Sequence, residues 1–370
     1  MSDYKVPFTK IRAINPHPGA DRLEIAKVYD FEVIIQKGKF QVGDKIIYVC
    51  IDSVLSPEVN AIAFPPDAKV KLHKARVKQI KLRGAISQGL ILDPASLSSL
   101  LDSSKLKDEQ DVSKELGITK YEPPTPAFQS GALGSMKVKP FCNPNFRTYN
   151  GITNIRWGHP FEGKEVVIQE KTHGTHCRFA KVPFVPNTFF KKVKKFFGLA
   201  PKFESVYGSN NVELTNRKGN KGYYGTDVYG QTLARFNAFD RIKDNEVVHA
   251  EIIGPGIQKG YSYGHKDHHL VIFDVRIVNA DGTQTWLNPE EVESFAKQRG
   301  FTFVPVLYTG LFSEEVLKEH TSGPSVYCPE EKIREGCVVK LRHGYDQNGS
   351  KQAFKSINPD YLAGDFGDNH

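Results

Sequence analysis

The stretch GKEVVIQEKTHGTHCRFAKV, residues 163–182, constrains the fold of this chain more than any other. Its apolar run at residues 166–168 predicts a short buried strand, and the β-branched and aromatic side chains of residues 175–182 predict a strand that returns beside it. Residues 172–174, Thr-His-Gly, break the strand pattern between them. The stretch therefore predicts a β-hairpin with Lys171 at the end of its first strand.

Lys171 has two interpretations from this position. It is either a solvated strand-end residue or a covalent nucleophile held at the mouth of a sheet. Burial and neighbouring cations lower the pKa of a lysine amine from about 10.4 toward neutrality, which frees its lone pair for attack. Gly174 would let a ligand or another backbone segment come close. Other segments of the chain distinguish between these two interpretations of Lys171.

The composition predicts a globular protein with a basic surface and room for two cores. Lys and Arg number 50 against 42 Asp and Glu among 370 residues, which favours a polyanionic partner. The five cysteines include no CxxC pair, so we expect neither a zinc knuckle nor a disulfide scaffold, and a reducing, intracellular location, most simply the cytoplasm. Neither an N-terminal signal core nor a run of about 18 apolar residues occurs.

The N-terminal part of the chain shows short strand patterns separated by turn signals, over residues 6–92, which predicts a small closed barrel. The segments INPHPGADRLEIAKV, residues 14–28, and KLRGAISQGLIL, residues 81–92, resemble the OB-fold domain related to tRNA-binding modules. The resemblance implies that the barrel binds nucleic acid across one face. The basic residues between positions 69 and 83 would either line a phosphate groove or protect an edge strand.

These patterns divide the chain into an OB-fold domain over residues 1–120, a linker over residues 121–140 and a second domain over residues 141–370. The linker contains Pro and Gly without periodicity. In the second domain, strand patterns alternate with helices that Asn288 and Ser313 are expected to begin. We expect an α+β domain built on antiparallel sheets.

One segment of the second domain, NTFFKKVKKFFGL at residues 187–199, predicts an amphipathic helix with phenylalanines on one face and lysines on the other. Three interpretations stay open. The helix is a basic clamp on a phosphate backbone, a membrane-surface helix, or an insertion whose phenylalanines pack inward. The membrane is the least favoured, because the segment is short and stands alone.

Four further segments follow the hairpin in a fixed order. They are VHAEIIGPGIQ (residues 248–258), VIFDVRI (271–277), REGCVVK (334–340) and KQAFKSI (351–357). Together with the Lys-Thr-His-Gly sequence at Lys171 they resemble the motifs of the covalent nucleotidyltransferase superfamily of polynucleotide ligases and capping enzymes. The Lys-x-His-Gly form resembles that of ATP-dependent RNA ligases. With an OB domain in front, the chain resembles the Deinococcus-type nick-sealing RNA ligases.

The resemblance implies a reaction in three steps. Lys171 attacks the α-phosphate of ATP to give lysyl-AMP and pyrophosphate, the AMP passes to a 5′-phosphate end, and a 3′-hydroxyl displaces it to seal the strand. A neutral amine facing a polyanion requires cationic groups and a divalent metal, Mg²⁺ or Mn²⁺. The expected partner is nucleic acid, either a nicked duplex with RNA on the 3′-hydroxyl side or RNA ends. We expect a monomer that engages no membrane.

The resemblance also implies roles for individual residues. Lys171, Glu335 and Lys355 are expected to act in catalysis, with Glu335 and Glu251 also at the metal. Phe273 would stack on adenine, and Asp274 would support the fold locally. The residues expected to bind the nucleotide are Gln169, Glu170, His173, Gly174, Glu251, Phe273 and Lys351.

Two positions depart from the nick-sealing pattern. His176 stands where those ligases carry an asparagine five residues after the lysine, and Asn210 stands where an arginine follows a serine. Contacts to the 5′-phosphate end are therefore expected to differ, with Arg178 or Arg217 as substitutes.

Two other functions stay open. A capping-type guanylyltransferase would share the lysine chemistry but react with GTP, and the motif histidine and the leading OB domain count against it. A non-catalytic OB protein that binds nucleic acid is the other alternative, and the intact Lys171, Glu251, Glu335 and Lys355 count against that one.

Overall fold

The computed structural model describes residues 4–68, 71–121, 142–149, 151–186, 189–215, 224–258, 261–331, 333–343 and 352–363. These residues fall into two compact units. The first lies within Met1–Pro123, Thr153–Pro160 and Leu362–Asp365, and the second contains the others. The expected linker, except for Tyr121, lies outside the described residues. No helix in the described ranges combines the length and apolar composition that crossing a membrane requires.

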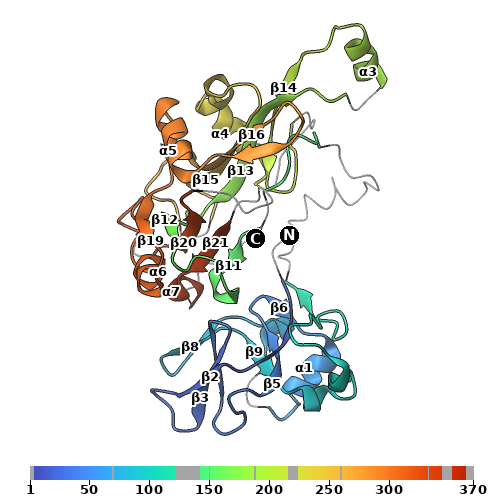
Figure 1. The fold of residues 1–370 in the computed structure, drawn as a ribbon, viewed down its shortest axis with the longest axis vertical. Helices are drawn as coiled ribbons and strands as arrows, with labels where there is room; N and C mark the ends of the chain where they lie inside the picture. Colours follow the sequence, from blue (N-terminus) through green and yellow to red (C-terminus); the bar gives the residue numbers. More distant parts are fainter. Residues whose placement is uncertain are drawn as a thin grey trace. The chain divides into compact units, whose positions relative to one another are not determined.

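The first unit is made of short antiparallel strands, as the sequence predicts (Figure 1). One sheet has the order β1-β5-β9, a second has the order β2-β3-β4, and two strand pairs, β6 with β10 and β7 with β8, complete it. The strands of these sheets are β1 (Phe8–Lys10), β2 (Ala13–Pro16), β3 (Leu23–Val28), β4 (Phe31–Gln36), β5 (Lys45–Val49), β6 (Ser53–Val54), β7 (Ile80–Leu82), β8 (Ala85–Ser87), β9 (Leu90–Leu92) and β10 (Thr119–Lys120), and β11 (Thr153–Asn154) belongs to none of them. The helices are α1 (Pro57–Ala63) and the 3-10 turns His73–Ala75, Pro94–Leu97, Ser103–Lys105 and Ile155–Trp157.

Residues 153–160 cluster with the first unit, although they follow the second domain's expected start in sequence. The Trp157 ring lies 4.9 Å from that of Tyr29 and 5.1 Å from that of Phe31, between ring centroids. The Asp30 N–H donates to the Arg156 carbonyl at 3.1 Å. Buried aromatic surface and backbone hydrogen bonds therefore fasten this segment to the barrel.

The second unit contains two large sheets. In the first of them the order is β14-β13-β15-β16-β17, with β18 parallel to β16 and all other pairs antiparallel. Its strands are β13 (Thr175–Pro183), β14 (Phe203–Ser209), β15 (Glu246–Ile253), β16 (His269–Val278), β17 (Gln284–Trp286) and β18 (Thr302–Phe303). Through the second sheet runs the antiparallel order β21-β20-β12-β19, with β12 (Glu165–Glu170), β19 (Val306–Leu311), β20 (Gly336–Leu341) and β21 (Ala353–Ile357). The helices are α3 (Phe189–Phe196), α4 (Val228–Arg235), α5 (Pro289–Gln298), α6 (Glu314–Thr321), α7 (Pro359–Ala363) and the 3-10 turn Ala238–Arg241.

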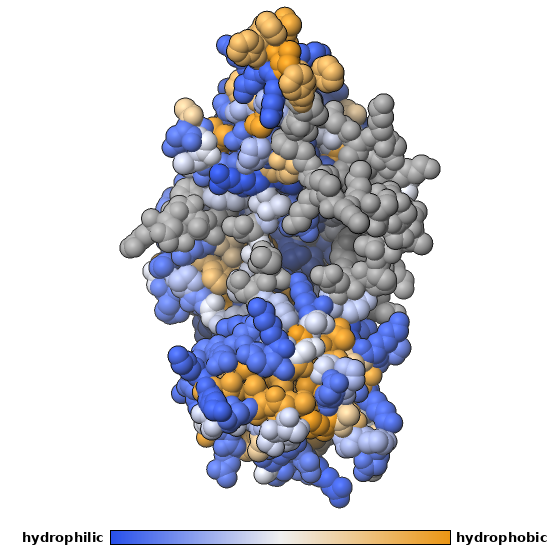
Figure 2. Space-filling view, turned by 90° about the vertical axis from the view of Figure 1, so that its right-hand side faces the viewer, coloured by the Kyte–Doolittle hydropathy of each residue, from blue (hydrophilic) through white to orange (hydrophobic). Residues whose placement is uncertain are grey.

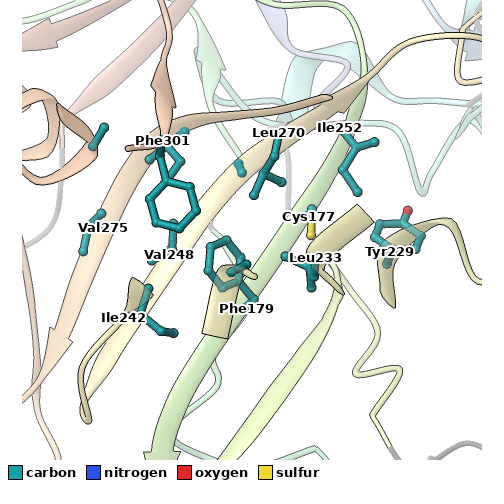
Figure 3. Packing of buried hydrophobic residues seen from close by; sticks show 14 of the residues in the cluster. Cys177, Phe179, Tyr229, Leu233, Ile242, Val248, Ile252, Leu270, Val275 and Phe301 are labelled. Atoms are coloured by element: carbon teal, nitrogen blue, oxygen red, sulfur yellow. The ribbon is translucent and has the colours of Figure 1, made fainter. Parts of the chain in front are cut away.

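The main core covers one face of the β13–β16 sheet (Figure 3). Side chains alternate along a strand, so Cys177 and Phe179 of β13 point into this core while His176 and Arg178 point to the opposite face. Helices α4 and α5 close the core with apolar residues such as Leu233 and Val292. At the opposite face these polar side chains lie on the same side as a smaller apolar cluster that includes Val182 and Val247.

The predicted helix starts at Asn288 and Ser313 are confirmed. The Asn288 N–H donates to Glu291 Oε2 at 2.6 Å, and the Val316 N–H donates to Ser313 Oγ at 3.2 Å. These bonds satisfy backbone donors that the first turn of a helix leaves unpaired. Local sequence therefore fixes the starts of α5 and α6.

The β-hairpin predicted for residues 163–182 is wrong. Its two strands are present as β12 and β13, but β12 pairs with β19 and β20 in one sheet, whereas β13 pairs with β14 and β15 in the other. Residue periodicity predicts the strands but does not determine which strands pair. Residues 171–174 therefore connect two sheets.

The predicted helix at residues 187–199 is present as α3, beyond the β13–β14 hairpin (Figure 1). The interpretation in which its phenylalanines pack inward is wrong, because Phe189, Phe190, Phe196 and Phe197 are all largely exposed. An isolated helix of this length has too few neighbouring elements to bury its rings. Residues 187 and 188 of the predicted segment lie outside the described residues.

Candidate active site

Lys171 lies where β12 ends, next to the start of β20. Its backbone N–H donates to the Gly336 carbonyl at 2.9 Å, and β12 pairs with β20 so that Glu170 lies opposite Cys337. This register brings Glu335 to Lys171, and Nζ of Lys171 lies 2.5 Å from Oε1 of Glu335. Only 28% of the Lys171 side chain and 13% of the Glu335 side chain are exposed. Two motifs that are distant in sequence therefore form one sheltered ion pair.

His173 contributes to the same group from the connection between β12 and β13. Its Nδ1 lies 3.5 Å from Oε2 of Glu335. The Tyr361 hydroxyl lies 3.1 Å from the same nitrogen, and the Tyr261 ring packs edge-on against the imidazole. The backbone N–H of His173 donates to the Tyr263 hydroxyl at 2.7 Å. Three tyrosines thus fix a buried histidine against the glutamate.

Gly174 lets β13 approach β15 closely, and this brings Glu251 into the site. A Cβ at position 174 would lie 2.4 Å from the Ile252 carbonyl oxygen and 2.7 Å from Cγ of Glu251. The Gly174 backbone donates to the Glu251 carboxylate, and Gln258 Nε2 donates to the Gly174 carbonyl at 2.7 Å. No residue with a side chain fits without moving backbone, which explains the glycine of the motif.

The two glutamates have opposite protonation behaviour. Burial raises the pKa of Glu251 to about 8, because the Lys171 ammonium only partly offsets it and the Glu335 charge adds to it. Burial also acts to raise the pKa of Glu335, but Lys171 and His173 outweigh it and lower that pKa to about 2. At neutral pH Glu335 is therefore the ionised partner of the lysine, while Glu251 largely keeps its proton.

A divalent cation fits the donors at this site. Oε2 of Glu335 is buried and accepts no hydrogen bond from the described residues. In the described ranges no three His, Cys, Asp or Glu side chains cluster closely enough to enclose a metal ion. Mg²⁺ commonly uses one or two carboxylates and completes its shell with water and substrate phosphate oxygens. Glu335 and Glu251 are carboxylates of that kind.

Lys355 lies on the same face of the second sheet as Lys171. Gln169, Val338 and Lys355 are aligned across β12, β20 and β21, and residues two apart in a strand share a face. Nε2 of Gln169 is buried without a hydrogen-bond acceptor among the described residues, as is expected of a donor that a ligand would satisfy. The register therefore brings Lys355 and the unused amide donor of Gln169 to the side of the sheet on which Lys171 lies. Lys351 lies outside the described residues.

Glu170 points to the other face of this sheet. Its carboxylate accepts hydrogen bonds from the Ser325 hydroxyl at 2.5 Å and from the Val326 and Tyr327 N–H groups at 2.7 and 3.3 Å. The expectation that Glu170 binds the nucleotide is thus not met by its side chain. The carboxylate instead holds the loop at residues 325–327, because the alternation of a strand separates it from Lys171.

Phe273 and Asp274 lie where the first sheet faces Lys340 of the second. Nζ of Lys340 lies 3.1 Å from Oδ1 of Asp274 and donates to the Phe273 carbonyl at 2.8 Å. The Tyr149 hydroxyl donates to Asp274 at 2.7 Å, and its ring packs edge-on against Phe273. Burial lowers the pKa of Lys340 to about 7. Asp274 therefore supports the fold through a buried ion pair with Lys340, which joins the two sheets.

Sequence reasoning did not single out Lys340 or Tyr149. The sequence did contain one signal for Lys340: it lies two residues after Val338 in the apolar run of β20, so the two side chains share a face of the strand. Its partner, 66 residues away, could not be read from the pattern. Tyr149 gave no signal, because its role depends on contacts with three other strands.

The two positions that depart from the nick-sealing pattern lie in a partly buried polar cluster. His176 Nε2 is 3.1 Å from His249 Nδ1, and burial, aided by Arg178 and Arg276, lowers the pKa of His176 to about 3. The Asn210 side chain accepts from the Tyr149 N–H at 2.9 Å.

Arg178, one of the two expected substitutes, is fully buried over the Phe146 ring and bonded to the Ser209 carbonyl. The hypothesis that Arg178 contacts a 5′-phosphate is therefore wrong. Arg217 lies outside the described residues.

Comparisons with known proteins agree with this geometry. A family model described as RNA ligase matches residues 164–357, more than half of the chain, and an OB-fold domain model matches residues 6–94.

Solved structures of Naegleria gruberi RNA ligase share the fold at 22% sequence identity. A variant with ATP and Mn has a TM-score of 0.72 and covers 97% of this chain and 98% of its own. The same enzyme with PPi has a TM-score of 0.71 and covers 96% and 97%. A variant with AMP and Mn has a TM-score of 0.71 and likewise covers 96% and 97%.

The raised pKa of Glu251 predicts a pH-dependent effect of Glu251→Gln on stability. The folded protein keeps this proton up to about pH 8, whereas the unfolded chain releases it near the ordinary value of 4.5, so Glu251 destabilises the fold increasingly between the two. Near pH 8 the variant should melt about 2–4 °C above the parent, a shift typical of about 1 kcal/mol. Near pH 4.5 the two proteins should melt at the same temperature. Calorimetry without ATP or metal measures both.

Glu335→Gln is the matched control. Its ionised form stabilises the fold above the ordinary pKa, so this variant should melt below the parent at both pH values. An equal effect of Glu251→Gln at both pH values would exclude the raised pKa.

Proposed function

This chain belongs to the RNA ligase family, and from that premise we propose that it seals nicks, joining a 5′-phosphate to a 3′-hydroxyl through a lysyl-AMP intermediate on Lys171. ATP would be the nucleotide and Mg²⁺ or Mn²⁺ the metal. Naegleria gruberi RNA ligase, which has the same fold, has been solved with ATP, AMP or PPi, and with Mn. The protein would act as a monomer in a reducing compartment, in keeping with its five free cysteines.

The observation that carries the proposal is the group formed by Lys171, Glu335 and Glu251. The Lys171 amine would attack the α-phosphorus of ATP, forming the N–P bond and breaking the bond to pyrophosphate. Attack requires the neutral amine, so one proton must first leave Nζ. Oε1 of Glu335, at 2.5 Å, is the closest base. Cationic groups near the amine, Lys355 and a bound divalent metal, would lower the pKa of the amine and favour release of this proton.

The departing pyrophosphate needs positive charge beside it. Lys355 lies on the face of Lys171 and is half-buried, so its ammonium would stabilise the phosphate oxygens as charge develops on the leaving group. A divalent cation held by Glu335 and Glu251 would supply further charge neutralisation when bound. Both roles depend on the register of β12, β20 and β21.

The nucleotide would be oriented by groups on the two facing sheets. Phe273, half-buried between Lys340 and Tyr149, would stack on adenine. The fixed His173 and the close-packed Gly174 would shape the turn beneath the phosphates. The unused amide donor of Gln169 would bind an acceptor of the nucleotide.

The OB unit would hold the nucleic acid. Lys74, Lys78 and Lys81 are exposed, within the basic stretch that sequence analysis identified. Lysines in such a row neutralise successive phosphates and release counterions, which gives affinity without sequence preference. A nicked duplex with RNA on the 3′-hydroxyl side is the substrate that we propose.

Lys171→Ala should abolish covalent nucleotide attachment, because alanine leaves no amine to attack. The purified protein, shown free of preattached AMP, is incubated with ATP or GTP and Mg²⁺ or Mn²⁺, and its intact mass is read. We expect one AMP adduct with ATP. Lys164→Ala, which removes an exposed lysine just before β12, should retain the adduct. An adduct with GTP alone would indicate a guanylyltransferase, and none with either nucleotide would indicate a binding protein.

Replacing Lys74, Lys78 and Lys81 together by Gln should lower sealing of a nicked RNA duplex about tenfold or more at physiological salt. Adenylylation should be unchanged, since these lysines lie in the OB unit. Lys105, Lys107 and Lys114, also exposed in that unit, replaced together by Gln provide the charge-matched control. Equal sealing by the two variants would refute the proposed role of the stretch at residues 74–81.

A further inference from the structure

Helix α3 and the residues that follow it to Leu199, here called the α3 surface, have no role in the proposed reaction. The rings of Phe189, Phe190, Phe196 and Phe197 are 67–85% exposed, and the Leu199 side chain is 75% exposed. Apolar side chains gather at the end of the molecule where α3 lies, beside strongly hydrophilic ones (Figure 2). Exposed apolar groups in such density mark a surface that meets a partner.

The helix separates its apolar and charged residues completely. At about 100° per residue, the apolar positions fill one arc of about 120° that no lysine enters. They are Phe189, Phe190, Val193, Phe196 and Phe197, and the remaining arc holds Lys191, Lys192, Lys194 and Lys195. Lys191 turns back over the Phe184 ring, 5.7 Å from its centroid.

The charge of this surface selects an anionic partner. Residues 189–203 contain five lysines and no Asp or Glu. A second copy of the chain would bring two such lysine sets together without compensating carboxylates. Packing of two α3 surfaces is therefore opposed by like-charge repulsion.

The rings do not form a platform for bases. Phe189 and Phe190 pack edge-on at 76°, and Phe196 and Phe197 pack edge-on at 87°. A nucleic acid bound through the lysines would leave this apolar arc in water, whereas single-stranded nucleic acid is bound by open aromatic faces. The partner must offer hydrocarbon and anions in adjacent layers.

We propose that the α3 surface binds the surface of an anionic phospholipid bilayer. The phenylalanines enter the boundary between headgroups and acyl chains, and the lysines reach lipid phosphates from the sides of the helix. Sequence analysis ranked this interpretation last, and the exposure of all four rings reverses that order. A short helix gives weak and reversible binding, which needs both the rings and the lipid charge.

The test is co-sedimentation of the full-length protein with vesicles. Vesicles of phosphatidylcholine mixed with phosphatidylglycerol should bind the protein about tenfold or more tightly than phosphatidylcholine alone. Replacing Phe189, Phe190, Phe196 and Phe197 together by Ser should lower that binding about tenfold or more, and so should replacing Lys192, Lys194 and Lys195 by Gln. Adenylylation of both variants should equal that of the parent, which shows that they fold.

The matched control replaces four exposed apolar residues elsewhere by Ser, at Val42, Ile80, Leu82 and Leu311, and should bind as the parent does. The proposal is overturned if the parent does not prefer anionic vesicles, or if the serine variant at α3 binds them as well as the control does. It is also overturned if the α3 changes leave vesicle binding intact but weaken binding of a nicked RNA duplex, or dissociate a dimer in sedimentation velocity.

Discussion

The ion pair of Lys171 and Glu335 is the interaction on which the site depends. A sheltered ion pair is stable only when its geometry is good and its remaining oxygens and protons have hydrogen-bond partners. Strand register supplies the geometry here, because the Lys171 N–H is bonded to the Gly336 carbonyl beside Glu335. His173, fixed by tyrosines, faces the second glutamate oxygen. Lys171 is therefore placed by the backbone of the sheet.

A second buried pair, Lys340 with Asp274, connects the two sheets of the catalytic unit. Removing either member would leave an uncompensated charge in a buried environment, which is strongly destabilising. One face of the β13–β16 sheet carries the main apolar core (Figure 3), and the other carries His176 and Arg178 together with a smaller apolar cluster. The same alternation that builds the main core thus places these polar side chains on the other face.

Local sequence predicted much of this architecture. The strands at residues 165–170 and 175–183, the caps at Asn288 and Ser313 and the antiparallel character of the sheets follow from residue periodicity and hydrogen-bonding chemistry that act over a few positions. The expected hairpin between those two strands is wrong, because strand pairing is decided by the whole fold. The approach of Lys171 to Glu335 was expected only from the order of motifs. Nothing in the spacing of residues 171 and 335 determines it, because strand order is a property of the whole fold. The same limit applies to Glu170, Arg178 and Lys340. Alternation along a strand predicts which residues share a face, but it does not predict what packs against that face. The phenylalanines of α3 show a second limit, because an amphipathic pattern does not say whether its apolar face is covered.

The central claim, that the amine of Lys171 forms the bond to AMP, can be tested at the level of the individual residue. The protein is reacted with ATP and a divalent metal, digested under mildly alkaline conditions that preserve a phosphoramidate, and its peptides are fragmented by mass spectrometry. The account predicts AMP on Lys171 alone. AMP on Lys340, Lys355 or any other residue, with Lys171 unmodified, would contradict it.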